Sequence, residues 1–184
     1  ATLTEGNTGS DISTLGKLYV SDVDTGQDRF QVVTGTLGSN SYGTFAIDST
    51  GNWTYTANSA HDEFVSGQAY TDSFVFRSQD NTASQTVTIT INGSNDAASI
   101  SGATSATLTE GNTSSDISTS GKLYVSDVDT GQDRFQVVTG TAGSYGTFAI
   151  DSTGNWTYTA NSAHDEFVSG QAYTDSFVFR SQDN

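Results

Sequence analysis

The sequence predicts an all-β protein made of two tandem antiparallel β-sandwich modules. Three observations support this prediction. The chain consists of two nearly identical copies of one sequence. Apolar residues alternate with polar ones along short segments, and no segment shows a long helical periodicity. Several short alternating strands separated by glycine-containing turns are typical of a β-sandwich and argue against an α/β fold.

The repeat sets the domain organisation. Residues 1–81 recur as residues 106–184 with three substitutions and one two-residue gap. The substitutions pair Gly9 with Ser114, Leu15 with Ser120 and Leu37 with Ala142, and the second copy lacks an equivalent of Asn40–Ser41. We expect modules at 1–96, without its leading segment, and at 97–184, without its last strand. The chain would then be a window from a longer array. Such tandem identity suits a spacer or a stalk better than an enzyme.

Each copy is expected to contain about seven strands. The clearest is the segment in which Val87, Ile89 and Ile91 alternate with threonines, the pattern of a half-buried strand. The other alternating pairs are Leu18 and Val20, Phe30 and Val32, Phe45 and Ile47, Trp53 and Tyr55, and Phe74 and Phe76. Residues 48–52 join two strands, and Gly51 supplies the positive φ that a hairpin turn needs.

One segment of each copy departs from the strand pattern. Residues 58–67 predict a short helical turn, with Ser59 as N-cap, acidic residues at Asp62 and Glu63, and Gly67 at the end. The adjacent His61, with its counterpart His164, is interpreted as a surface cap element and not as a catalytic base. No nucleophile elbow or oxyanion-hole motif accompanies it.

The charge restricts the partners of the chain. The formal net charge is −15, which disfavours nucleic acid because its phosphates would be repelled. The sequence contains no cysteine, so disulfides cannot stabilise the modules, and it contains no apolar run of about 18 residues that would insert into a membrane. Bound metal ions are the remaining obvious source of stability.

The acidic residues cluster in a way that predicts a cation site. Asp22, Asp24 and Asp28 fall within seven residues around Gly26, between two predicted strands. The same stretch returns with Asp127, Asp129 and Asp133. Alternating carboxylates in a loop are suited to Ca²⁺, which takes six to eight oxygen ligands. An EF-hand is excluded, because its final position is Val33 instead of glutamate and no helices flank the loop. An ordinary acidic turn is the alternative.

Five stretches resemble one family: Leu3–Gly6, Gly16–Asp24, Tyr42–Asp48, Gly51–Tyr55 and Gly67–Phe74. In this order they resemble the VCBS repeat over nearly all of each copy. The resemblance implies immunoglobulin-like or cadherin-like sandwiches joined end to end in very large bacterial surface proteins. It also implies biofilm adhesins of the RTX type, exported by type I secretion, with Ca²⁺ at the junctions. The chain departs from the family at Asn95–Ala98, where a proline is often found.

The cadherin analogy implies further ligands. An acidic residue near the first strand, a linker Asn-Asp pair and the Asp-x-Asp of the next module share ions in such arrays. The candidates that follow are Glu5, Asn95, Asp96, Asp127 and Asp129 at one junction, with Glu110, Asp80 and Asp183 as secondary candidates.

The predicted function is therefore mechanical and not enzymatic. We expect an extracellular extender repeat on a bacterial cell surface, made rigid by Ca²⁺, that holds a distal adhesive region away from the cell and contacts neighbouring repeats. Two alternatives remain open. A carbohydrate-binding module would use Trp53, Tyr55 and their counterparts Trp156 and Tyr158 as a stacking platform, although their alternation favours core packing. A self-assembling fibre subunit would associate through an open strand edge.

Overall fold

The computed structural model describes residues 1–183, and the chain divides into two compact units, Ala1–Asn95 and Asp96–Asn184. We call them the first unit and the second unit. Both are built from β-strands apart from one short 3₁₀ helix in each, η1 (Gly9–Ile12) and η2 (Ser114–Ile117). The prediction of an all-β fold with tandem sandwich modules is confirmed.

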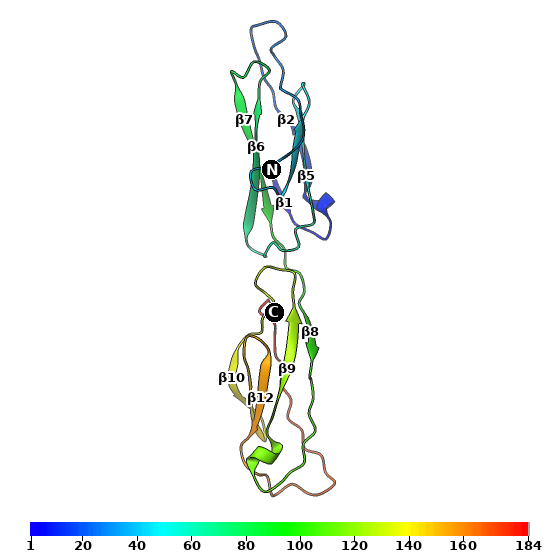
Figure 1. Ribbon diagram of the computed structural model, residues 1–184, viewed down its shortest axis with the longest axis vertical. Helices are drawn as coiled ribbons and strands as arrows, with labels where there is room; N and C mark the ends of the chain where they lie inside the picture. The colour runs from blue at the N-terminus through cyan, green and yellow to red at the C-terminus, as the bar shows by residue number, and fades with distance from the viewer. Residues whose placement is uncertain (184) are drawn as a thin grey trace. The chain divides into compact units, whose positions relative to one another are not determined.

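The first unit contains two sheets. One has the order β1 (Thr2–Thr4), β7 (Ser84–Asn92) and β6 (Ala69–Arg77), with β7 in the middle. The other has the order β2 (Ser13–Lys17), β5 (Asn52–Ala57), β4 (Gly43–Ile47) and β3 (Val33–Leu37). Strand β7 pairs antiparallel with β6 over nine residues and parallel with β1 over three, and the β6–β7 pair is visible in Figure 1.

The core of the first unit lies between these sheets. Strand β7 contributes Val87, Ile89 and Ile91, all buried, as its alternation predicts. Phe45, Tyr55 and Phe76 face them from the other strands and are fully buried. The Phe45 ring lies 4.7 Å from Tyr55 and 6.2 Å from Phe76, so aromatic packing contributes to this core.

The second unit has one five-stranded sheet. Its order is β10 (Val138–Ala142), β11 (Gly146–Ile150), β12 (Asn155–Ala160), β9 (Thr119–Ser126) and β8 (Ser99–Gly102). Its buried apolar cluster is smaller and consists of Leu123, Phe135, Ile150 and Trp156. No strand is assigned between residues 161 and 183, although residues 172–180 repeat the sequence of β6.

Local predictions had mixed outcomes. The hairpin at 48–52 is confirmed, since it joins β4 to β5 with Gly51 at φ 89°. The helical turn at 58–67 is wrong, because His61 adopts φ 62° and only an isolated turn follows, closed by a bond from Phe64 N to the His61 carbonyl. The helical turns of the structure lie at η1 and η2 instead. No described residue belongs to a helix long and apolar enough to cross a membrane.

Candidate metal centre

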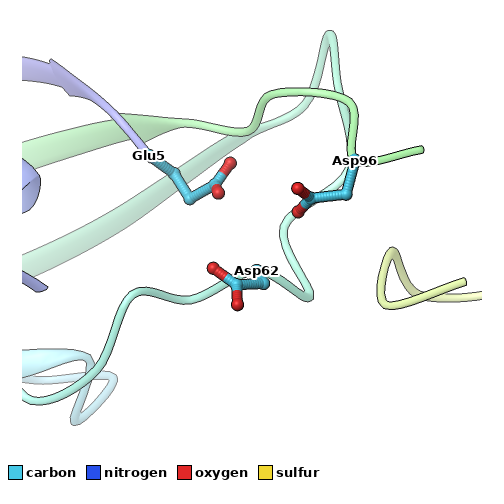
Figure 2. A group of neighbouring side chains, drawn as sticks. All are labelled: Glu5, Asp62 and Asp96. Carbon is cyan, nitrogen blue, oxygen red and sulfur yellow. The ribbon is translucent and has the colours of Figure 1, made fainter. Parts of the chain in front are cut away.

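Three carboxylates from distant parts of the sequence converge where the chain leaves the first unit. Glu5, Asp62 and Asp96 each offer an oxygen, and these oxygens lie within 4.8 Å of one another. Figure 2 shows the three side chains pointing toward a common centre. Asp96 directly follows Asn95, the last residue of the first unit, so the peptide bond keeps it at this end.

Glu5 is fixed by the sheet. It follows β1, and its backbone N–H donates to the Asn92 carbonyl at 2.8 Å, which continues the pairing with β7. Its side chain is only 4% exposed, and Oε2 accepts bonds from the backbone N–H and the hydroxyl of Ser94, each at 2.8 Å. A carboxylate held in this way has little freedom to turn away from the cluster.

Asp62 is presented by a strained turn. His61 precedes it in the left-handed region and is locked by bonds from its ring to Glu63 Oε1 and to the Tyr42 carbonyl, both at 2.8 Å. The His61 ring also stacks on Phe64 at 4.7 Å. Within residues 1–183, Asp62 Oδ1 is buried and has no hydrogen-bond partner. A buried carboxylate oxygen in this state is costly unless a cation binds it.

A second group of carboxylates gathers at the start of the second unit. The Asp96 backbone N–H donates to Asp129 Oδ2 at 3.0 Å, and the Asp129 N–H donates to Asp127 Oδ1 at 2.9 Å. The Ala98 N–H lies 3.4 Å from Asp183 Oδ2. Asp129 is 2% exposed, and Asp127 Oδ2 is buried without a hydrogen-bond partner in the described part of the chain.

The donor set identifies the kind of ion that fits. Every converging ligand is a carboxylate oxygen, with no histidine or cysteine among them. Hard oxygen ligands select Ca²⁺, Mg²⁺ or Mn²⁺ over zinc or copper, and irregular sets built from loops suit Ca²⁺ best because it tolerates variable geometry. The residues present therefore fit a calcium ion.

The predicted ligands in the first copy of the acidic stretch lie elsewhere. The Asp24 N–H donates to Asp22 Oδ1 at 2.9 Å, the same turn as in the second copy, but Asp24 and Asp28 are exposed. Asp133 and Glu110 are exposed as well. Among residues 1–183, none of these four joins a group of three converging ligands.

Asp80 has a local role in the structure. It accepts bonds from the Ser78 hydroxyl at 2.6 Å and from the Thr82 N–H at 3.2 Å, so it stabilises the turn between β6 and β7. The hydrogen bonds from Ser78 and Thr82 lower the pKa of Asp80 to about 2. Its counterpart Asp183 instead lies beside Ala98.

The sequence alone does not single out Asp62 as a candidate ligand. It was assigned to the first turn of a helix, where an acidic residue has an ordinary explanation. No spacing rule connects it with Glu5 and Asp96, because the three residues meet only through the fold.

The aromatic pairs do not form an open platform. Trp156 is buried, and its Nε1–H donates to the Ala103 carbonyl at 3.1 Å. Tyr55 is fully buried, and Trp53 packs against the core of the first unit. This arrangement agrees with core packing and gives no support to a sugar-stacking surface.

Comparison with known proteins identifies the modules. A family model described as bacterial cadherin-like domain matches residues 1–93 and again residues 95–184. The chain belongs to this family. Its two cadherin-like domains are tandem β-sandwich modules of a kind that is generally structural or adhesive. No curated protein matches the chain.

Two solved structures of protocadherins are among those that the chain resembles. The protocadherin gammaB7 EC3-6 cis-dimer structure is 17% identical, with a TM-score of 0.44, over 86% of this chain and 37% of that one. Protocadherin Gamma B2 extracellular cadherin domains 1-5 is 14% identical, with a TM-score of 0.45, over 88% of this chain and 30% of that one. The chain thus spans about a third of the length of these structures.

Proposed function

We propose that this chain is an extender segment of a large extracellular bacterial adhesin, in which tandem cadherin-like domains hold a distal adhesive region away from the cell. The family match supports the structural role, and the near-identity of the copies supports a stalk. The VCBS-like stretches described above are the basis for the finer assignment to RTX-type adhesins exported by type I secretion.

The observation that carries this proposal is the convergence of Glu5, Asp62 and Asp96. Like charges at this separation repel one another, and Asp62 Oδ1 has no hydrogen-bond partner among residues 1–183. Ca²⁺ bound to the three carboxylates would cancel the repulsion and restrain the connection at Asn95–Asp96. Asp127 and Asp129, whose carboxylates gather beside Asp96 within the second unit, are proposed as further calcium ligands there.

The proposal also gives a role to the surrounding calcium concentration. Where Ca²⁺ is scarce, as in a bacterial cytoplasm, repulsion among the carboxylates would keep the connection slack and the chain easy to export. Outside the cell, Ca²⁺ would bind and stiffen it, because a metal that binds only the folded form stabilises that form.

The repeat provides matched controls for a binding test. Asp62→Asn and Glu5→Gln should weaken Ca²⁺ binding at least about tenfold in isothermal titration calorimetry, since each removes a ligand charge. The counterpart variants Asp165→Asn and Glu110→Gln change exposed residues and should leave the affinity unchanged. Equal losses in both pairs would refute the assignment of these ligands.

The mechanical role has its own test. Small-angle scattering and calorimetry of the 184-residue chain in Ca²⁺ and in EGTA should show a stiffer particle and a higher melting temperature with the ion. An unchanged scattering profile together with normal Ca²⁺ binding would retain the ion site and exclude its role in stiffening.

A further inference from the structure

One of the three substitutions between the copies completes a chemical motif. Residues 7–9 read Asn-Thr-Gly, whereas residues 112–114 read Asn-Thr-Ser. An asparagine followed two residues later by serine or threonine, with no proline between them, is the acceptor pattern of N-linked glycosylation. Because Ser114 stands where the first copy has Gly9, this loop carries the pattern in the second copy and not in the first.

The loop that carries this pattern has the same structure in both units. Asn7 and Asn112 are exposed, and each lies in a bend directly before the N-cap threonine of η1 or η2. In both units the threonine hydroxyl donates to the aspartate three residues later, at 2.9 Å in η1 and 3.0 Å in η2. Asn7 is exposed in a unit that contains both sheets. The exposure of this asparagine is therefore a property of the loop and does not depend on which strands the second unit contains.

The acceptor groups in this loop are not used by the fold. Among residues 1–183, neither the Asn112 amide nor the Ser114 hydroxyl forms a hydrogen bond. Only Ser114, the first residue of η2, belongs to an assigned element, so the stretch has no strand partner either. An enzyme can therefore reach the Asn112 amide nitrogen without breaking an internal hydrogen bond of that side chain.

Two further matches to the pattern begin β5 and β12, and their amides are occupied. The Asn52 Nδ2 group donates to Asp48 Oδ2 at 2.7 Å and to Thr50 Oγ1 at 2.9 Å. Asn155 makes the equivalent two bonds at 2.8 and 3.0 Å. Both strands also pair with a neighbour on each side. Glycosylation at either asparagine would therefore disrupt a turn and would require access to a central strand.

The remaining match is held by strand pairing and by Glu5. Asn92 is the last residue of β7, and its carbonyl accepts a bond from the Glu5 N–H at 2.8 Å. The hydroxyl of its pattern belongs to Ser94 and donates to Glu5 Oε2 at 2.8 Å. Within residues 1–183, the stretch at Asn112 is thus the one match in which both the amide and the hydroxyl two residues later lack an internal partner.

We propose that Asn112 is an acceptor for N-linked glycosylation from a diphosphate-activated sugar. The Asn112 Nδ2 atom would attack the anomeric carbon of the sugar and form a C–N bond. The bond from that carbon to the diphosphate leaving group breaks at the same time, and the amide gives up one proton to a base of the transferase. The donor is either a nucleotide-activated hexose or a lipid-linked oligosaccharide, since both present the same anomeric centre.

A glycan at this position would distinguish two otherwise nearly identical modules. It would add a bulky, uncharged and solubilising group to one copy, at an exposed loop. The acceptor stretch includes none of the carboxylates of the candidate metal centre. The proposal is therefore independent of calcium binding, and either one can fail without the other.

Enzymatic glycosylation of the folded 184-residue chain tests the proposal. One reaction contains a soluble N-glycosyltransferase with UDP-glucose, and a parallel reaction contains a membrane oligosaccharyltransferase with a lipid-linked oligosaccharide. Intact-mass spectrometry measures the added sugar, and peptide mapping locates it, since Ser114 distinguishes the second-copy peptide from the first. We expect a single glycan per chain, at Asn112, in at least one of the reactions, and the reaction that succeeds identifies the donor.

The first copy provides a matched pair of variants. Ser114→Gly gives the second copy the sequence of the first and should abolish the modification. Gly9→Ser does the reverse and should add a second glycan, at Asn7; the second unit already holds serine at this position, so the loop accommodates it. The proposal is overturned if neither enzyme modifies the folded chain, if Ser114→Gly is modified as strongly as the wild type, or if the sugar is found at Asn52, Asn92 or Asn155 instead.

Discussion

The two units use almost the same residues and reach different states of packing. Phe76 is fully buried in the first unit, whereas Phe179, its identical counterpart, is half-buried in the second. The substitutions at Leu15 and Leu37 do not explain this, because these side chains are themselves 76% and 53% exposed. The difference comes from β7, so one strand determines whether the same aromatic residues form a sealed core.

A second difference between the units is the length of β2 and of its counterpart β9. In the second unit, β9 extends to Ser126 because β8 pairs with Leu123–Ser126. In the first unit, β2 ends at Lys17, and Tyr19 is 84% exposed. The length of this strand therefore depends on whether a neighbouring strand pairs with its C-terminal end.

Partial or complete burial also raises the pKa of the equivalent tyrosines, Tyr55 and Tyr158. Burial, reinforced by the charge of Asp72, raises the pKa of Tyr55 well above its ordinary value. Burial, followed by the hydrogen bond to Asp175, raises the pKa of Tyr158 to about 12. In both units the first cause is desolvation, which disfavours the charged phenolate.

The largest change in stability that we expect comes from truncating Phe76 or its counterpart Phe179. Phe76→Ala should lower the free energy of unfolding of the first unit by about 4 kcal/mol, because it leaves a cavity in a sealed core. Phe179→Ala should cost the second unit about half as much, since that site is partly open. Urea unfolding monitored by Trp53 in a Trp156→Phe background, and the reverse, would report each unit separately. Equal losses would contradict the contrast in packing.

The next effect concerns the buried carboxylate. Asp72→Asn should cost about 3 kcal/mol, because a fully buried acceptor of three backbone bonds loses its charge. Asp175→Asn should cost about 1 kcal/mol in its more exposed site. The same unfolding experiment measures both, and Asp165→Asn, at an exposed residue, serves as a control for loss of charge alone.

The pH dependence of the Asp175 contribution has a definite sign. Burial raises the pKa of Asp175, but hydrogen bonds from the backbone of Tyr145 and Ser144 outweigh it, so the pKa falls below its ordinary value of 3.8. The stabilisation is therefore complete above about pH 4 and lost as the pH falls through the lowered value. Acid titration of wild type against Asp175→Asn should show the two stabilities converging only in this acidic range.

A smaller effect is expected at the second histidine. The hydrogen bond to Glu166, followed by that to the Tyr145 carbonyl, raises the pKa of His164 above 6.5. Its contribution to stability is then complete below pH 6.5 and lost as the pH rises through the raised value. In a His61→Gln background, NMR titration of the remaining imidazole should give a midpoint above 6.5, and Glu166→Gln should lower it. A midpoint that does not respond to Glu166→Gln would argue against this ion pair.

The smallest effect should come from the differences between the copies themselves. Leu15→Ser gives the first copy the residue of the second at a position that is 76% exposed. We expect a change within about 0.5 kcal/mol, because little apolar surface is involved. A larger loss would mean that the substitutions, and not β7, separate the two units.

The sequence by itself determined the repeat, the fold class and the hairpin at residues 48–52. Alternation at Val87, Ile89 and Ile91 is a property of neighbouring residues, and so is the hairpin at Gly51 with its positive φ. The acidic stretches were visible for the same reason. Tertiary structure decided which acidic residues converge, since Glu5, Asp62 and Asp96 are brought together by strand pairing and a turn at His61.

Tertiary structure alone also decided whether identical segments form strands and whether identical residues are buried. Residues 69–77 form a strand and residues 172–180 do not, although their sequences are the same. Asp24 is exposed, whereas Asp129 is buried and accepts a hydrogen bond from the Asp96 N–H. Strand formation and burial depend on a partner from elsewhere in the fold, so a segment cannot specify them without that partner.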